Sequence, residues 1–191
     1  MNSDESIFAA AKKLEADFGY IDVLVNNAGI AVDYEFGKPG LRDILRKQFE
    51  TNVFGLMVLS EALIPLLKKS KDPRIVNVSS GLGSISLRTK SDIPYYGVTS
   101  DPYRMTKSAV NMLTQCQNYH MREFGGKSWA FCPGYVVTDL TGEADRENRI
   151  KNGALSPEVS ARGIKEIVEG KRDEEFLQFV TISEMGGKYG W

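Results

Sequence analysis

The sequence predicts an α/β fold built on a parallel sheet. Short apolar runs rich in β-branched residues alternate along the chain with helical patterns longer than ten residues, and this alternation is typical of βαβ units. The 191 residues are 42% hydrophobic and 26% charged, which is the composition of an ordinary globular protein. Because the sequence contains no internal repeat, low-complexity tract or linker, we expect a single domain over residues 1–191.

The first part of the chain predicts a helix, a strand and a long helical segment. Residues 3–19 predict a helix, because apolar positions recur at helical spacing between a Ser-Asp start and a glycine. Residues 21–27 (IDVLVNN) are a short, β-branched apolar run and predict a buried strand. A long helical pattern follows from about 40 to 69, with a shift expected at Pro65.

The second part of the chain continues the alternation of strand and helix. Residues 74–80 (RIVNVSS) predict a second buried strand. An Asp-Pro pair predicts the cap and first turn of a helix over 101–124. A third strand is expected at 129–134, a helix at 156–170 and a last strand near 176–182.

The ends of the predicted strands are the first place to search for a site. Ligands of parallel α/β sheets bind at the carboxyl ends of the strands, which here are followed by residues 26–29, 79–83 and 133–138. Two polar loops, 81–100 and 141–152, follow the same ends. We expect these loops to border a substrate, and the many charges of the second argue against an apolar lid inserted in a membrane.

Charge and hydropathy argue against several classes of function. With 24 Lys and Arg against 25 Asp and Glu, the net charge is −1, which offers no electrostatic basis for binding nucleic acid or an anionic membrane. The longest apolar runs have roughly ten residues, too few to span a bilayer. The first residues show no signal-peptide pattern. We therefore expect no nucleic-acid partner and no membrane.

The cysteines and the histidine are few. Cys116 and Cys132 are the only cysteines, which predicts a reducing, cytoplasmic location and buried, small apolar side chains. His120 is the only histidine and lies in a polar helical stretch, so we expect it to be solvated. A mechanism that needs two histidines is excluded, and no cluster of ligands predicts a metal site.

A tyrosine and a lysine at helical spacing are candidates for acid–base chemistry. Tyr103 and Lys107 are four residues apart near a predicted helix start, so they share one face. The cation and the helix N-terminus should lower the pKa of the phenol from about 10 toward the range of a general acid or base. The same spacing occurs at Tyr34 and Lys38, where a glycine and a proline argue against a helix, so the spacing alone is not specific.

Four further candidates each have a simpler structural interpretation. Asn52 lies in a helical pattern among apolar residues, where asparagine is unfavourable, so it either bonds across a helix interface or serves a site. Ser80 could donate a hydrogen bond to a carbonyl oxygen or only satisfy the local backbone. The Asn-Asn-Ala-Gly sequence at 26–29 could admit a flat ligand close to the backbone or form a simple turn, and Pro133–Gly134 could also be only a turn.

Taken in order, these motifs resemble one family. Asn-Asn-Ala-Gly after the first strand, Asn52 in the helix, Asn-Val-Ser-Ser at the second strand, Tyr-x-x-x-Lys and Pro-Gly-Tyr-Val-Val-Thr are similar to the short-chain dehydrogenase/reductase family in its classical, carbonyl-reductase-like branch. The resemblance covers essentially all 191 residues. It implies a Rossmann-like, doubly wound parallel sheet and hydride transfer between a nicotinamide cofactor, NADP with NAD as the alternative, and a small carbonyl or alcohol substrate.

The resemblance also implies a role for each candidate residue. Tyr103 would be the acid/base, Lys107 would bind the nicotinamide ribose and lower the pKa of Tyr103, and Ser80 would hold the substrate oxygen. Asn52 would hold a water that links Lys107 to solvent. Asn26, Ala28 and Gly29 would line the adenosine ribose, and Pro133, Gly134, Val136 and Thr138 would bind the carboxamide and a phosphate. Tyr95 and Tyr96 would contact substrate or pack their loop onto the body.

The sequence departs from the family at its start. It begins in the helix before the family's fourth strand, so the first strands and the glycine-rich phosphate loop are expected to be lacking, and the strand at 21–27 becomes an apolar edge. Three interpretations stay open: a fragment of a longer reductase, a truncated chain that folds with weak or no activity, or a non-enzymatic binding or scaffold protein. A homo-oligomer is expected either through this edge or through the helices at 40–69 and 101–124, as in the family.

Overall fold

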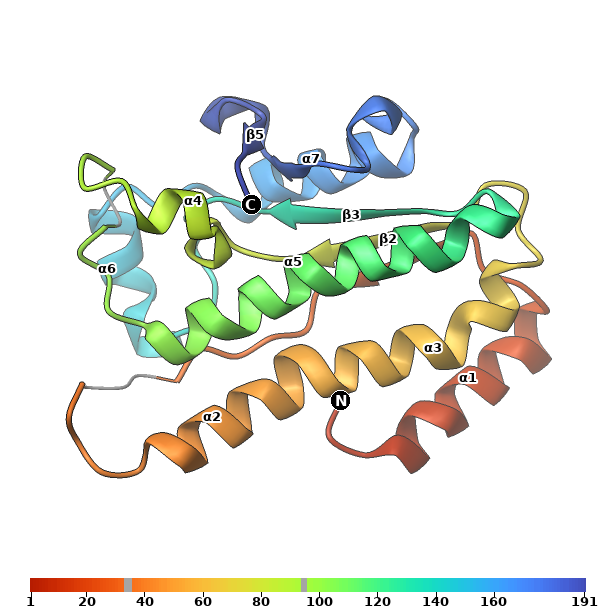
Figure 1. Cartoon of the computed structure of the whole chain (residues 1–191), viewed down its shortest axis with the longest axis horizontal. Coiled ribbons are helices and arrows are strands. Elements are labelled where there is room, and N and C mark those ends of the chain that lie inside the picture. The colour runs from red at the N-terminus through yellow and green to blue at the C-terminus, as the bar shows by residue number, and fades with distance from the viewer. Residues whose placement is uncertain (33–35, 94–95) are drawn as a thin grey trace.

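A five-stranded sheet forms the centre of the protein, in the order β1-β2-β3-β4-β5 (Figure 1). The computed structural model describes residues 1–32, 36–93 and 96–191. The strands are β1 (Val23–Asn26), β2 (Arg74–Val78), β3 (Lys127–Cys132), β4 (Phe179–Thr181) and β5 (Lys188–Tyr189). The first four are parallel, as predicted, and only the two-residue β5 is antiparallel to its neighbour.

The helices alternate with these strands. They are α1 (Asp4–Phe18), α2 (Leu41–Phe49), α3 (Gly55–Leu67), α4 (Ile85–Arg88), α5 (Asp101–Met121), α6 (Arg146–Lys151) and α7 (Pro157–Val168). Ser3 caps α1, its side chain accepting a bond from the Ser6 backbone, and Gly19 ends it at φ 76°. Ser100, rather than the first residue of the expected Asp-Pro pair, is the N-cap position of α5.

The expected helix over 40–69 is present but is interrupted at a different residue. A π-helical turn, Glu50–Phe54, separates α2 from α3, whereas Pro65 lies inside α3. The expectation of a shift at Pro65 was therefore wrong. A π turn widens the helix by one residue per turn and is often found at functional sites, and this one contains Asn52.

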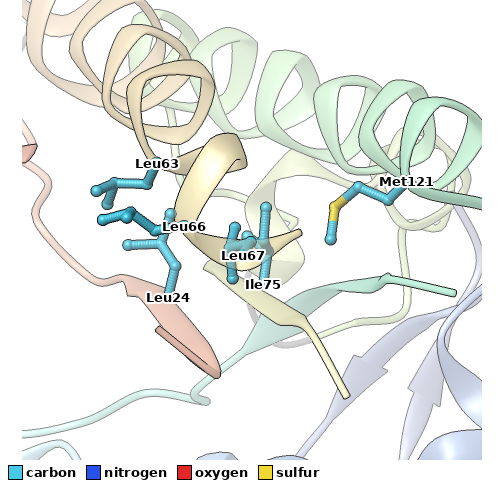
Figure 2. Close-up of a cluster of buried hydrophobic side chains, with 6 residues drawn as sticks. All are labelled: Leu24, Leu63, Leu66, Leu67, Ile75 and Met121. Carbon is cyan, nitrogen blue, oxygen red and sulfur yellow. The ribbon is translucent and has the colours of Figure 1, made fainter. Parts of the chain in front are cut away.

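Helices cover both faces of the sheet, as the doubly wound, Rossmann-like fold requires. On one face α1, α3 and α5 pack together with the sheet, and α7 covers the other (Figure 1). Figure 2 shows the core of the first face, formed by Leu24, Leu63, Leu66, Leu67, Ile75 and Met121. The second core contains Val76, Trp129, Phe131, Ile167, Val180 and Ile182. Neighbouring residues Ile75 and Val76 of β2 serve opposite cores because strand side chains alternate.

Several single-residue expectations can be compared with this fold. β1 is the edge strand, and Val25 on it is 38% exposed, as the sequence predicted. His120 is exposed, also as predicted. Cys132 is buried, but Cys116 is exposed, so the expectation of two buried thiols was wrong for Cys116. Its position on α5 faces away from the sheet that the helix covers.

One helical stretch bears on the expectation of no membrane. Residues Leu41–Leu67 form a helical stretch of 27 residues, and an 18-residue window within it has a mean hydropathy of 1.4. By length and composition this stretch could cross a membrane, and counting only uninterrupted apolar runs missed it. However, 39% of that window is buried inside the fold, and the core helices of soluble proteins pass the same test.

Candidate active site

Tyr103 and Lys107 lie buried at the start of α5. Tyr103 is 7% exposed and Lys107 is 4% exposed. The Lys107 Nζ lies 5.6 Å from the centroid of the Tyr103 ring and donates a 2.8 Å hydrogen bond to the Val78 carbonyl at the end of β2. The shared helix face is thus as predicted. In the alternative pair, Lys38 lies in a turn segment rather than a helix, and Tyr34 lies outside the described residues.

Ser80 follows β2 and lies close to the tyrosine. Hydrogen bonding from its side chain acts to lower the pKa of the Tyr103 phenol. The Ser80 Oγ accepts a 3.2 Å bond from the backbone N–H of Leu82 and so caps the 3₁₀ turn Gly81–Gly83. The structure thus shows that Ser80 satisfies the local backbone, and a hydrogen bond to a substrate oxygen stays a prediction.

Burial dominates the electrostatics of the pair. It raises the pKa of Tyr103, the nearby Cys132 adds to this rise, and the Ser80 hydrogen bond and the charge of Arg149 oppose it. Burial also lowers the pKa of Lys107 to about 8, which the Cys132 thiol partly opposes. The direction for Tyr103 is opposite to the expectation, because desolvation outweighs the helix N-terminus. A protonated phenol at neutral pH is suited to donate a proton.

Asn52 connects the segment after β1 to α5. From the π turn, its Oδ1 accepts a 2.8 Å bond from the Ile30 backbone N–H, and its Nδ2 donates to the Ile30 carbonyl at 2.8 Å and to the Thr106 hydroxyl at 3.1 Å. The side chain is fully buried. Of the two interpretations, the structure shows the first: Asn52 bonds across a helix interface to Thr106, the residue that precedes Lys107 in α5.

The turn after β1 approaches the same group. An added Cβ at Gly29 would lie 3.4 Å from the Asn52 Oδ1 and 3.5 Å from the Lys107 Nζ. Ala28 is exposed. The Asn26 Nδ2 donates to Ser60 and to Asn77, at 3.0 and 2.8 Å, while the buried Asn26 Oδ1 has no hydrogen-bond partner. Gly29 is thus brought to the site, and Asn26 ties strand to helix.

The segment after β3 makes contacts of its own. Gly134 has φ 83°, and an added Cβ would lie 3.0 Å from the Met185 Sδ, so a glycine is required there. Val136 is buried and bridges to Leu155. The Thr138 hydroxyl accepts a bond from the Leu140 backbone within the same turn. These contacts do not test the cofactor role implied for Pro133, which is half-buried, or for its neighbours.

Three residues that hold the site together were missed by the sequence interpretation. The Cys132 Sγ accepts a 3.1 Å bond from the Gly81 N–H. Asn111 accepts a 2.6 Å bond from the Ser79 hydroxyl and donates to the Gly83 carbonyl at 3.3 Å. An added Cβ at Gly83 would lie only 2.6 Å from the Lys107 backbone carbon. The Gly-x-Gly spacing at Gly81–Gly83 was the signal in the sequence for this close approach.

Part of a nicotinamide cofactor fits these residues. A lysine ammonium has three donors, and the buried Lys107 uses one on the Val78 carbonyl, so donors remain for ribose hydroxyls. The absent side chain of Gly29 leaves room beside it. Within residues 1–32, 36–93 and 96–191, no strand is followed by a glycine-rich turn and a helix of the kind that binds a pyrophosphate.

Comparisons with known proteins agree with this geometry. The family model described as short chain dehydrogenase matches residues 1–149. The short-chain dehydrogenase anuI of Penicillium roqueforti is 36% identical over 196 aligned residues, covering 100% of this chain and 74% of its own length. The short-chain dehydrogenase/reductase tropE of Talaromyces stipitatus is 31% identical over 191 residues, covering 94% of this chain and 71% of its own.

A solved structure extends the comparison to the fold. The NADPH-bound carbonyl reductase from chicken fatty liver matches with a TM-score of 0.82 and 28% identity, over 100% of this chain and 74% of that one. The sheet, the covering helices and the order of the motifs therefore lead to the same assignment. The chain belongs to the short-chain dehydrogenase/reductase family of oxidoreductases.

Proposed function

We propose that this protein catalyses hydride transfer between a nicotinamide cofactor and a small carbonyl or alcohol substrate, with Tyr103 as the acid/base. The observation that carries the proposal is the buried group formed by Tyr103, Ser80 and Lys107. The Ser80 side chain acts on the pKa of the phenol through hydrogen bonding, and the Lys107 Nζ lies 5.6 Å from the centroid of the Tyr103 ring. Ser80 follows β2, and Lys107 on α5 reaches the carbonyl at the end of the same strand, where such folds bind ligands.

The residues divide the work as follows. When bound, the nicotinamide supplies or accepts the hydride. Ser80 donates a hydrogen bond to the substrate oxygen, and the Tyr103 hydroxyl gives up its proton to that oxygen as negative charge develops there. Lys107 binds the ribose through its remaining donors. Asn52 fixes the segment after β1 against α5, and holding a water beside Lys107 is its proposed further role.

We propose NADP as the cofactor, with NAD as the other option. The support is the likeness to a carbonyl reductase whose solved structure contains NADPH. The segment Pro133–Thr138 and the turn Asn26–Gly29 follow strands on either side of the Tyr103 group, as the carboxamide and ribose roles require. Reduction of a carbonyl is the proposed direction, because the similar solved structure is that of a carbonyl reductase with NADPH bound.

Substitution of Tyr103 tests the proposal. With NADPH and a panel of ketones and aldehydes, we expect Tyr103→Phe to lower kcat/KM by at least about 100-fold, since the proton donor is lost. Circular dichroism and the change in nicotinamide fluorescence on binding should match the wild type. Tyr119→Phe is the matched control, because Tyr119 lies on the same helix and is 62% exposed.

Two outcomes would contradict the proposal. A loss of less than about tenfold in Tyr103→Phe would show that the phenol is not the acid. A wild-type chain with no turnover and no saturable nicotinamide fluorescence would favour the non-enzymatic binding or scaffold function instead.

A further inference from the structure

Arg149 is a buried cation on a short surface helix. It is 7% exposed and is the buried residue of α6. By contrast, Arg146 on the same helix has a side chain that is 51% exposed and pairs with Asp139. Placing a guanidinium away from water is unfavourable unless it is fully engaged. The contacts of Arg149 should therefore show what the burial achieves.

Those contacts all converge on the segment that follows β3. The Arg149 Nη1 donates a 2.7 Å bond to the Val136 carbonyl, and the Nε donates to the Thr141 hydroxyl at 3.0 Å. The Nε also lies 3.4 Å from an Asp145 carboxylate oxygen. The guanidinium stacks over the Tyr135 ring at 5.2 Å from its centroid. One planar group thus joins α6 to two ends of the preceding loop.

A second set of bonds holds the same segment from the other side. The Leu155 N–H donates to the Tyr135 carbonyl at 2.7 Å, and the Val137 N–H donates to the Leu155 carbonyl at 3.0 Å. The result is a small folded unit between β3 and α7 (Figure 1). Arg149 lies inside this unit, because its partner Val136 is flanked by the two residues that carry these bonds.

The unit includes part of the segment proposed to bind the cofactor. That segment begins at Pro133, directly after the end of β3 at Cys132, and Arg149 binds the Val136 carbonyl within it. The charge of Arg149 also acts to lower the pKa of Tyr103, whereas burial and Cys132 raise it.

We propose that Arg149 is a positioning residue for the proposed cofactor segment, because it fastens α6 to Tyr135–Thr141. Its effect on cofactor binding rests on the proposed function. Its structural part does not, because the hydrogen bonds to Val136 and Thr141 are present whatever the chain binds. Arg149 acts through the segment that it holds and does not itself transfer a proton.

Amide hydrogen exchange of the full chain tests the structural part. In Arg149→Met we expect at least about tenfold faster exchange at the Val137 and Leu155 amides, whose bonds lie beside the lost anchor. Amides of β2 should exchange as in the wild type. Arg146→Met is the matched control, since it removes an exposed guanidinium from the same helix. Equal exchange in the two variants would overturn the proposal.

Steady-state kinetics test the effect on cofactor binding. In Arg149→Met we expect the KM for NADPH to rise about 10- to 100-fold, with a smaller change in kcat, because the segment proposed to contact the cofactor is displaced. Arg149→Lys keeps the charge but not the planar set of donors, so its KM should stay raised and its exchange fast. Arg146→Met should keep the wild-type KM.

The two arms separate the failure of this inference from the failure of the proposed function. If the wild type has no turnover, the exchange result still supports or overturns the anchoring role. If turnover is normal but the KM of Arg149→Met for NADPH does not change, the role in cofactor binding is wrong. Should Arg149→Met not fold, Arg149→Lys must still show fast exchange at Val137 and Leu155, and protection equal to the wild type would overturn the inference.

Discussion

Lys107 is held in a state that burial opposes. Its pKa is lowered to about 8 in the folded chain, against about 10.4 for an unperturbed lysine. Between these values the unfolded chain binds a proton that the folded chain does not, so the free energy of unfolding rises with pH there. This gain in stability is complete above the pKa of the unfolded chain, about 10.4, and is lost as pH falls through 8. At neutral pH, where Lys107 is charged in both states, its burial therefore destabilises the fold.

The titration of Lys107 should be measurable as a pH dependence of stability. We expect the free energy of unfolding of the wild type, relative to Lys107→Met, to rise by about 2 kcal/mol between pH 8 and pH 10. Urea denaturation of both proteins measures it. The difference is needed because the raised pKa of Cys132 has the opposite effect in both chains. If the two proteins had the same pH dependence, the effect would not come from Lys107. Lys165→Met is the control, because Lys165 is an exposed lysine on α7.

At this scale the sequence predicted which residues meet but not their ionisation. The helical spacing placed Tyr103 and Lys107 on one face, and the position of Ser80 after a strand brought its hydroxyl to the phenol. The direction of the pKa of Tyr103 was predicted wrongly, because desolvation depends on what packs around the side chain. The charge of Arg149 was missed for the same reason, since it arrives from a different element.

The turn Gly81–Gly83 is the element that fixes the distance between Ser80 and α5. It follows Ser80, and the Ser108 hydroxyl donates a 2.8 Å bond to the Gly83 carbonyl. The backbone approaches so closely that a methyl group at Gly83 would meet the Lys107 backbone at 2.6 Å. Backbone atoms cannot move aside as a flexible side-chain end can, so the turn itself must shift.

We therefore expect Gly83→Ala to lower kcat/KM by at least about tenfold and to destabilise the fold by about 1–3 kcal/mol. Steady-state kinetics and thermal unfolding measure the two effects. Gly97→Ala is the matched control, because nothing lies within 4 Å of an added Cβ there. Similar behaviour of the two variants would show that the close approach is relieved without consequence.

The elements themselves were largely predicted, and their interruptions were not. Periodicity located α1, α5 and α7 and the four parallel strands. It could not locate the π turn, because the extra residue is stabilised by the bonds of Asn52 to Ile30 and Thr106. Those partners are more than twenty residues away in the sequence. The signal in the sequence was Asn52, a polar residue in an apolar helical pattern, and one of its two interpretations, a bond across a helix interface, is confirmed.

At the scale of the whole molecule, the edge of the sheet is a candidate surface for self-association. β1 has one neighbour, and Val25 points outward from it at 38% exposure. An apolar edge without a charge is a template for pairing with another chain. The face of α5 is the other candidate surface for an oligomer, since Met105 and Met112 on it are 52% and 67% exposed.

We expect Val25→Lys to reduce self-association, because a charge on the edge opposes strand pairing. Light scattering over a range of concentrations measures it, and the free energy of unfolding should change by less than about 1 kcal/mol. Met112→Lys is the comparison variant. If Met112→Lys dissociates the assembly and Val25→Lys does not, the interface is the helix face and the prediction is wrong.

The sequence predicted the parallel sheet but not the contacts of the C-terminal residue. The alternation of elements predicted that the strands form a parallel sheet. It did not predict that the Trp191 carbonyl would accept a 2.8 Å bond from the Ser86 N–H, or that its ring would stack on Phe179. Such contacts join positions that no local pattern relates. The cytoplasmic location expected from the cysteines stays a prediction.

The opposite environments of the two thiols provide a reporter of opening at the site. Cys116 faces solvent, while Cys132 is enclosed at the end of β3, where burial also raises its pKa. A brief treatment with iodoacetamide should therefore add one carbamidomethyl group to the native chain and two to the unfolded chain, as counted by mass spectrometry. The rate of the second addition would then measure how often the strand end beside Tyr103 comes apart.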